Sequence, residues 1–125
     1  MSRARRAAAC LLLAVLLAAG IAAARSPADS LPEVATSALP QEARRTLDSI
    51  ASGGPYPYQR DGVVFANREQ RLPRHARGYY HEYTVKTPGV KTRGAQRIIC
   101  GGGLRSIAEC YYTDDHYQSF RRIRP

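Results

Sequence analysis

The chain has 125 residues, with 19 Lys and Arg against 10 Asp and Glu, which gives a formal net charge of +9. This length excludes a multidomain protein and leaves one small domain, of a size at which stability is marginal. The excess of basic side chains, most of them arginine, favours a polyanionic partner with nucleic acid first. A basic soluble protein with no special partner has the same composition, so charge alone does not separate the two.

The first 24 residues have the pattern of a secretory signal peptide. Three arginines precede an apolar run, residues 10–21, and three alanines follow it. A basic start, a short apolar centre and an A-x-A end are typical of such a peptide, with cleavage after Ala24. The run is shorter than the roughly 20 residues that span a bilayer, which argues against a membrane anchor. We therefore expect an exported, extracellular protein with no membrane association after cleavage and a mature net charge of +6.

The mature chain begins with a segment of Pro and Ser, residues 25–36, for which we expect a flexible arm. Residues 41–52 follow with apolar positions at helical spacing, Ala43, Leu47 and Ile50 among them. Pro40 suits the first turn of a helix, and the glycine pair 53–54 suits its end. The spacing therefore predicts one helix over residues 41–52.

Beyond the helix the chain changes to strand signals. Four segments rich in β-branched and aromatic residues are separated by Gly, Pro or Asp, namely residues 62–65, 79–87, 97–100 and 111–113. Residues 87–89, Thr-Pro-Gly, predict a turn between two antiparallel strands. A helix followed by several strands indicates an α+β fold in which one main helix packs on an antiparallel sheet.

Alternation along two of these strands separates inward from outward side chains, because residues two apart in a strand share a face. The inward set is Tyr83, Val85, Ile98 and Cys100. With these against the helix, Glu82 and Arg97 emerge together on the opposite, open face. From alternation alone the pair is equally an ordinary surface ion pair of little energetic weight.

Beyond these elements, the chain contains a set of short motifs in a fixed order: SALP (37–40), DGVVF (61–65), NRE (67–69), GYYHEYTV (78–85), RG (93–94), RIICG (97–101) and DHY (115–117). In these motifs the chain resembles the secreted bacterial guanyl-specific ribonucleases, the small microbial enzymes related to barnase. The likeness covers residues 35–123. It implies an α+β fold over a ribonuclease domain of residues 37–125, and a cyclising cleavage of RNA after guanine that uses no cofactor and no metal.

The resemblance also implies roles for particular residues. Glu82 corresponds to the general base that takes the proton of the ribose 2′-hydroxyl, and His116 to the general acid that protonates the departing 5′-oxygen. Arg93 and Arg97 correspond to the groups that hold the phosphate and stabilise its developing charge. Tyr117 corresponds to a phenol that contacts the phosphate. A plain surface histidine remains the alternative for His116.

Base recognition is expected from residues 65–69. Phe65 corresponds to the aromatic platform, and the carboxylate of Glu69 can accept from both donors on the Watson–Crick edge of guanine. Backbone N–H groups of Asn67 and Arg68 would donate to the guanine acceptors. The alternatives are a strand core residue for Phe65 and a loop-fixing hydrogen-bonding role for Asn67. Ala66 departs from the longer polar side chain expected at its position.

Cysteine usage differs from that of related enzymes, which often join an N-terminal and a C-terminal cysteine. Here Ala35 takes the first position and no second cysteine follows Cys110. After signal cleavage Cys100 and Cys110 remain. Either they pair across an enlarged hairpin or Cys100 is a core residue without a partner.

We expect a monomer whose substrate is single-stranded, guanine-containing RNA, with a small acidic barstar-like inhibitor protein as a candidate partner. Two alternatives remain open. One is a catalytically inactive basic RNA-binding protein, and the other is a toxin ribonuclease with a dedicated inhibitor.

Overall fold

The computed structural model describes residue 20 and residues 30–125. The predicted signal peptide therefore lies outside the described residues except for Gly20, and so does the first part of the predicted arm, residues 25–29. Within the described part of the chain, no helix has the length and apolar character needed to cross a membrane.

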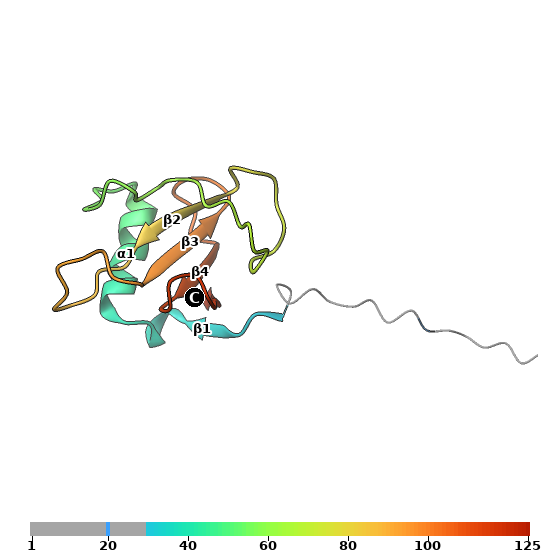
Figure 1. The fold of residues 1–125 in the computed structure, drawn as a ribbon, viewed down its shortest axis with the longest axis horizontal. Coiled ribbons are helices and arrows are strands. Elements are labelled where there is room, and N and C mark those ends of the chain that lie inside the picture. Colours follow the sequence, from blue (N-terminus) through green and yellow to red (C-terminus); the bar gives the residue numbers. More distant parts are fainter. Residues whose placement is uncertain (1–19, 21–29) are drawn as a thin grey trace, which may run out of the picture.

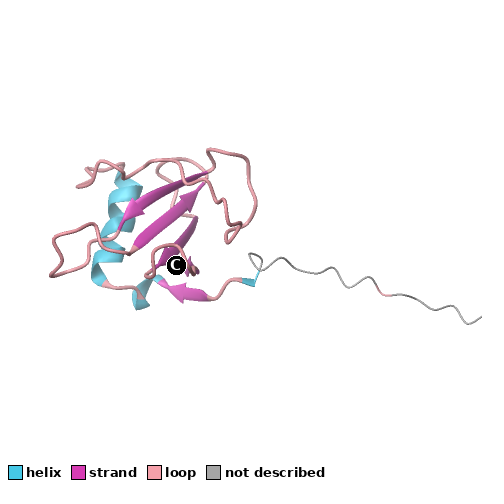
Figure 2. Cartoon of the chain, viewed as in Figure 1, coloured by secondary structure: helices cyan, strands magenta, loops and turns pink. Residues whose placement is uncertain are grey.

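The fold is one helix packed on one face of a five-stranded sheet, as predicted (Figure 1 and Figure 2). The helix is α1 (Gln41–Ser52), preceded by a short 3₁₀ helix, η2 (Thr36–Ala38). The strands are β1 (Glu33–Ala35), β2 (Tyr80–Thr84), β3 (Arg97–Gly101), β4 (Glu109–Thr113) and β5 (Arg121–Arg124). Their order is β1-β5-β4-β3-β2; β1 and β5 are parallel and the other pairs are antiparallel.

The helix occupies the predicted residues. Pro40 precedes its first turn, and Gly53 ends it with φ of 79°, a left-handed conformation in which glycine carries no steric penalty. Its inward stripe of Ala43, Leu47 and Ile50 is buried against the sheet. Helical spacing thus places one apolar face where the sheet can cover it.

The predicted inward set of the sheet is confirmed. Tyr83, Val85, Ile98 and Cys100 all belong to the apolar cluster under α1. Glu82 and Arg97 lie on the other face, but that face is not open as expected. A second cluster, made of Leu72, Tyr80, Ile99, Tyr111 and Phe120, covers much of it. Its strand residues are joined by Leu72 and Phe120 from segments outside the strands. Glu82 and Arg97 are only 5% and 2% exposed.

The predicted flexible arm is wrong for its last residues, because Glu33–Ala35 forms β1 beside β5. The Arg122 N–H donates to the carbonyl of Pro32 at 2.8 Å, and the Thr36 hydroxyl donates to that of Arg124 at 2.7 Å. This pairing satisfies backbone groups that would otherwise form an exposed sheet edge. The basic segment Arg121–Arg124 is likewise a strand, β5, because it pairs with β1 on one side and β4 on the other.

The predicted strand at residues 62–65 is also not a full strand. It forms one isolated bridge, Val64 to His81, and Gly62 has φ of 88°. Three backbone hydrogen bonds still attach it to β2: Gly62 N–H to Glu82 O, Glu82 N–H to Val63 O, and Phe65 N–H to Tyr80 O. The segment therefore runs beside β2 and carries Phe65 toward the second cluster.

The two cysteines form a disulfide across the β3–β4 hairpin, which settles the alternative left open by the sequence. Cys100 and Cys110 are directly paired in the antiparallel register, with their Cα atoms 4.1 Å apart. The predicted turn is present at Pro88–Gly89, in the connection between β2 and β3. Both features stabilise the strands that carry the polar face described next.

Candidate active site

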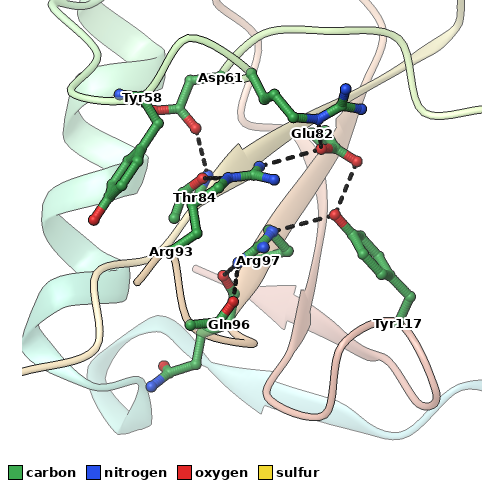
Figure 3. Close-up of polar contacts among 10 residues, drawn as sticks. Tyr58, Asp61, Glu82, Thr84, Arg93, Gln96, Arg97 and Tyr117 are labelled. Carbon is green, nitrogen blue, oxygen red and sulfur yellow. Dashed lines mark hydrogen bonds and ion pairs between the residues drawn. The ribbon is translucent and has the colours of Figure 1, made fainter. Parts of the chain in front are cut away.

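The carboxylate of Glu82 is the centre of a polar cluster on β2 (Figure 3). Its Oε1 accepts from Nη2 of Arg93 at 3.3 Å and lies 3.8 Å from Nε of Arg60. Its Oε2 accepts from the Tyr117 hydroxyl at 3.0 Å. A buried carboxylate is unfavourable without such partners, so these contacts compensate for its burial and fix its orientation.

Arg97 lies at the start of β3, directly opposite Thr84 in the register. Its Nη1 donates to the carbonyls of Gly94 and Gln96 at 3.0 and 2.7 Å, and its Nε donates to the Tyr117 hydroxyl at 3.2 Å. The guanidinium is thereby fixed from two directions although it is almost wholly buried. It presents a preorganised positive charge beside the carboxylate.

Arg93 reaches the same carboxylate from the β2–β3 connection. Its Nε donates to the Thr84 hydroxyl at 2.9 Å while Nη2 holds Glu82. Thr84 lies two residues after Glu82 and therefore on the same face of β2. The Thr84 hydroxyl therefore orients the Arg93 guanidinium toward Glu82.

Asp61 attaches the loop around residues 58–61 to β2 at Thr84. One of its carboxylate oxygens accepts from the Thr84 backbone N–H at 2.7 Å, and the other accepts from that of Tyr58 at 3.2 Å. The loop is thus held beside β2, which is how the neighbouring Arg60 comes near Glu82. Arg60 itself remains mostly exposed.

Tyr117 connects the acidic and basic groups. Burial raises the pKa of its hydroxyl, the Glu82 carboxylate raises it further, and Arg97 opposes the shift. The hydroxyl therefore stays protonated at neutral pH, donating to Glu82 while accepting from Arg97. The same ring stacks on Phe65 with centroids 5.5 Å apart.

His116 adjoins this cluster through Tyr117, the two ring centroids being 4.8 Å apart. Both residues have positive φ, 56° and 70°. The His116 N–H donates to the carbonyl of Ala95, which attaches its loop to the β2–β3 connection. The His116 side chain is exposed to solvent.

Asp115 maintains the unusual shape of the His116 loop. Its carboxylate accepts from the Ser119 hydroxyl and backbone N–H and from the Thr113 hydroxyl. These hydrogen bonds, with that from the Ser119 hydroxyl the strongest, lower the pKa of Asp115 to about 2. The carboxylate is therefore a structural anchor that stays ionised.

The predicted base-recognition residues are only partly brought together. Phe65, Asn67 and Arg68 line one hollow of about 250 Å³, while Glu69 is exposed and outside its lining. The Asn67 side chain donates to the Leu72 carbonyl and accepts from the Leu72 N–H, at 2.9 and 3.1 Å. This is the loop-fixing role named as its alternative, and the φ of 52° at Asn67 fits it.

The structure thus brings Glu82, Arg93, Arg97 and Tyr117 into direct contact and places His116 and Phe65 against Tyr117. Sequence reasoning missed Arg60 and the supporting pair Thr84 and Asp61. Strand alternation was the signal for Thr84. No local sequence pattern indicates Arg60, because its approach to Glu82 depends on the loop that Asp61 holds beside β2. Within residues 30–125, no three His, Cys, Asp or Glu side chains gather as a metal-ligand group.

The chain is similar to several known proteins. A family model described as ribonuclease matches residues 22–124. The guanyl-specific ribonuclease Sa3 of Kitasatospora aureofaciens is 62% identical over 90 residues, which are 72% of this chain and 62% of that relative. The guanyl-specific ribonuclease Sa of the same organism is 59% identical over 90 residues, which are 72% of this chain and 91% of that relative. The chain therefore spans less than two thirds of Sa3 but nearly all of Sa.

A solved structure shows the same fold. The crystal structure of ribonuclease Sa2 with guanosine-2′-cyclophosphate superposes with a TM-score of 0.70 at 51% identity, covering 77% of this chain and 98% of Sa2. The chain therefore belongs to the ribonuclease family that contains the guanyl-specific enzymes Sa and Sa3.

Proposed function

We propose that this protein is an exported endoribonuclease that cleaves single-stranded RNA after guanosine and forms a 2′,3′-cyclic phosphate. The observation that carries the proposal is the buried Glu82 carboxylate, held between Arg93 and a Tyr117 hydroxyl that also meets Arg97. An acid, two guanidiniums and a neighbouring imidazole are the groups that transfer a ribose hydroxyl onto its own phosphate. Export rests on the pattern of the first 24 residues.

In the first step Glu82 acts as the general base. It takes the proton of the guanosine 2′-hydroxyl as the 2′-oxygen bonds to phosphorus. The bond from phosphorus to the 5′-oxygen breaks, and protonated His116 gives that oxygen its proton. Proton transfers of this kind each contribute about 10²–10⁴-fold to the rate.

In the second step the two residues exchange roles. Neutral His116 takes a proton from water, whose oxygen attacks the cyclic phosphate, and Glu82 returns a proton to the departing 2′-oxygen. The product is a 3′-phosphate, and both residues regain their starting states. The reaction thus needs groups on either side of one phosphodiester.

Arg93, Arg97 and Tyr117 hold the phosphate during both steps. Arg97 and Tyr117 are fixed before substrate arrives, so little reorganisation accompanies the growth of negative charge on the phosphate oxygens. A phosphate oxygen entering this site competes with Glu82 for the same donors. That competition frees the carboxylate to accept the 2′-hydroxyl proton.

Guanine is held by residues 65–69. Its ring stacks on Phe65, backbone N–H groups of Asn67 and Arg68 face its acceptors, and the Glu69 carboxylate accepts from its two donors. Glu69 forms no ion pair within residues 30–125, so it is unengaged for this task. A solved relative supports the presence of a guanine-nucleotide site, since ribonuclease Sa2 has been crystallised with 3′-GMP.

The test is to incubate the mature protein, residues 25–125, with short RNAs in EDTA and identify the ends produced. We expect breaks after guanosine with 2′,3′-cyclic termini. Glu69→Ala should lower the preference for guanosine over adenosine more than it lowers turnover at saturating substrate. Tight RNA binding without cleavage would instead identify an inactive RNA-binding protein, and an unchanged preference would discard the role of Glu69.

A small acidic inhibitor resembling barstar remains a proposed partner, because an exported ribonuclease endangers the RNA of the cell that makes it. Such an inhibitor would bind over the site around Glu82, where Arg93 and Arg97 lie. Co-purification of the tagged protein from its own host, followed by an inhibition assay, tests this part. Full activity in the presence of every co-purified acidic protein would reject it.

A further inference from the structure

The loop that leads into β2 carries an unusual concentration of arginine. We name residues 66–78 the arginine loop; it has four arginines and one histidine against one carboxylate, that of Glu69. The four arginines are Arg68, Arg71, Arg74 and Arg77. Such a density of positive charge attracts a polyanion.

These arginines are also not neutralised within the protein. The ion pairs within residues 30–125 all use arginines outside the loop, at positions 45, 60, 93, 121 and 124. Arg68, Arg74 and Arg77 are exposed and form no hydrogen bond or ion pair with the described residues. Their donors therefore remain free for a ligand.

The loop is nevertheless held firmly in place. Leu72 is buried in the second cluster and is joined to Asn67 by two hydrogen bonds. The Tyr80 hydroxyl donates to the Pro73 carbonyl, and the Tyr79 N–H donates to the Ala76 carbonyl. A fixed backbone presents the exposed side chains without the ordering cost of a disordered segment.

An aromatic group lies among these charges. The exposed His75 ring stacks on Tyr79 with centroids 3.7 Å apart and planes 16° apart. The Tyr79 hydroxyl donates to Glu109 at 2.9 Å, so this hydrogen bond anchors the stacked pair. His75 and Arg77 line the hollow of about 250 Å³ together with Phe65 and Arg68.

The position of the loop indicates which part of an RNA it meets. It enters β2 at Tyr80, whereas the connection that carries Arg93 leaves β2 at Thr84, at the other end of the strand (Figure 1). The lining of the hollow contains none of the proposed catalytic residues. In the proposed binding mode the 3′-phosphate lies at Glu82 and the base on Phe65, which shares the hollow with the loop residues His75 and Arg77. The 5′-oxygen of this guanosine is the end that the catalytic groups leave unbound.

We propose that the arginine loop is a subsite for the nucleotide on the 5′ side of the guanosine. Arg74 and Arg77 bind the phosphate that joins the two nucleosides, and His75, supported by Tyr79, stacks on the upstream base. This inference rests on the proposed function and extends it. The protein would then contact one nucleotide upstream of the dinucleotide that it cleaves.

Three substrates separate the parts of the subsite, namely GpC, pGpC and ApGpC. The 5′-phosphate of pGpC tests the arginines, and the added nucleoside of ApGpC tests His75. In the unmodified mature protein we expect kcat/KM to rise about fivefold from GpC to pGpC, the size of two exposed charge contacts, with a decrease in KM. A further rise of similar size, about fivefold, is expected for ApGpC from base stacking.

Matched variants assign the gain to the loop. Arg74→Ala with Arg77→Ala should leave GpC cleavage unchanged and abolish the gain with pGpC. Arg44→Ala with Arg105→Ala removes the same charge from exposed positions outside the loop and should keep that gain. His75→Ala should reduce the additional gain of ApGpC alone.

The outcomes that overturn the inference are distinct from those that overturn the proposed function. Failure to cleave GpC or ApGpC would reject the ribonuclease assignment. Equal kcat/KM for GpC and pGpC, or equal losses in both double variants, would reject the subsite and leave nonspecific attraction. Affinities for uncleavable dGpC, pdGpC and ApdGpC test the subsite without catalysis, and equal affinities for the three would reject it.

Discussion

The two faces of the sheet are built from alternate residues of the same strands, yet they are stabilised differently. On the helix side Tyr83 and Ile98 are buried among apolar neighbours. One position away, Glu82 and Arg97 are equally buried, but each is surrounded by hydrogen-bonding partners. The comparison shows that the helix face contributes apolar burial, whereas the other face combines an apolar cluster with buried charges held in fixed positions.

The largest expected effect on the site face is that of Glu82→Gln. It keeps the shape but replaces one acceptor oxygen with an NH2 donor, and it cannot take the 2′-hydroxyl proton, so cyclisation should slow by about 10²–10⁴-fold. Single-turnover cleavage of GpC measures this loss, and titration with uncleavable dGpC checks that binding is retained. Normal cleavage by the variant would show that another group is the base.

On the helix face the largest effect should fall on stability. Ile98→Ala opens a cavity under α1 and should lower the free energy of unfolding by about 2–5 kcal/mol, with kcat/KM nearly unchanged while the protein is folded. Urea unfolding and GpC cleavage at low temperature measure the two quantities.

Ile99→Ala is the matched control, because Ile99 is equally buried but packs in the second cluster, beside the site. It should cost a similar free energy and also lower kcat/KM. Identical kcat/KM in the two variants would contradict the prediction that packing on the site side of the sheet positions the catalytic residues and packing on the helix side does not.

The disulfide should matter to stability and not to chemistry. Replacing both Cys100 and Cys110 by Ala removes a cross-link with a sequence separation of 10, worth about 3 kcal/mol in the chain-entropy model. Urea unfolding under non-reducing conditions should show that loss, whereas GpC cleavage should stay within about twofold below the unfolding transition. A large fall in activity of the folded variant would mean that the disulfide also positions Arg97.

The smallest effect concerns Asp115 and depends on pH. Its folded pKa of about 2 lies below the ordinary 3.8, so its ionised form stabilises the fold above pH 4. That contribution is lost as the pH falls from about 4 to 2. Asp115→Asn should therefore be less stable than the unmodified protein at pH 6, and the difference should vanish near pH 2. A difference that is independent of pH would show that the charge does not hold the loop.

Local patterns determined much of this protein. Helical spacing and its flanking Pro and Gly were enough to predict α1 to the residue, because its signals lie within 15 residues of each other. Strand alternation put Glu82 and Arg97 on one face and Tyr83 and Ile98 on the other. These features follow from backbone geometry, which acts over a few residues.

Only the tertiary structure decided the rest. The pairing of Glu33–Ala35 with β5 joins segments almost 90 residues apart. A segment of only three residues is too short to show the alternating pattern that predicts a strand. The burial of Glu82 and the approach of Arg60 to its carboxylate likewise depend on contacts between a strand and the loops outside it. Such contacts are set by how loops close over a finished sheet, and no short pattern in the chain encodes that closure.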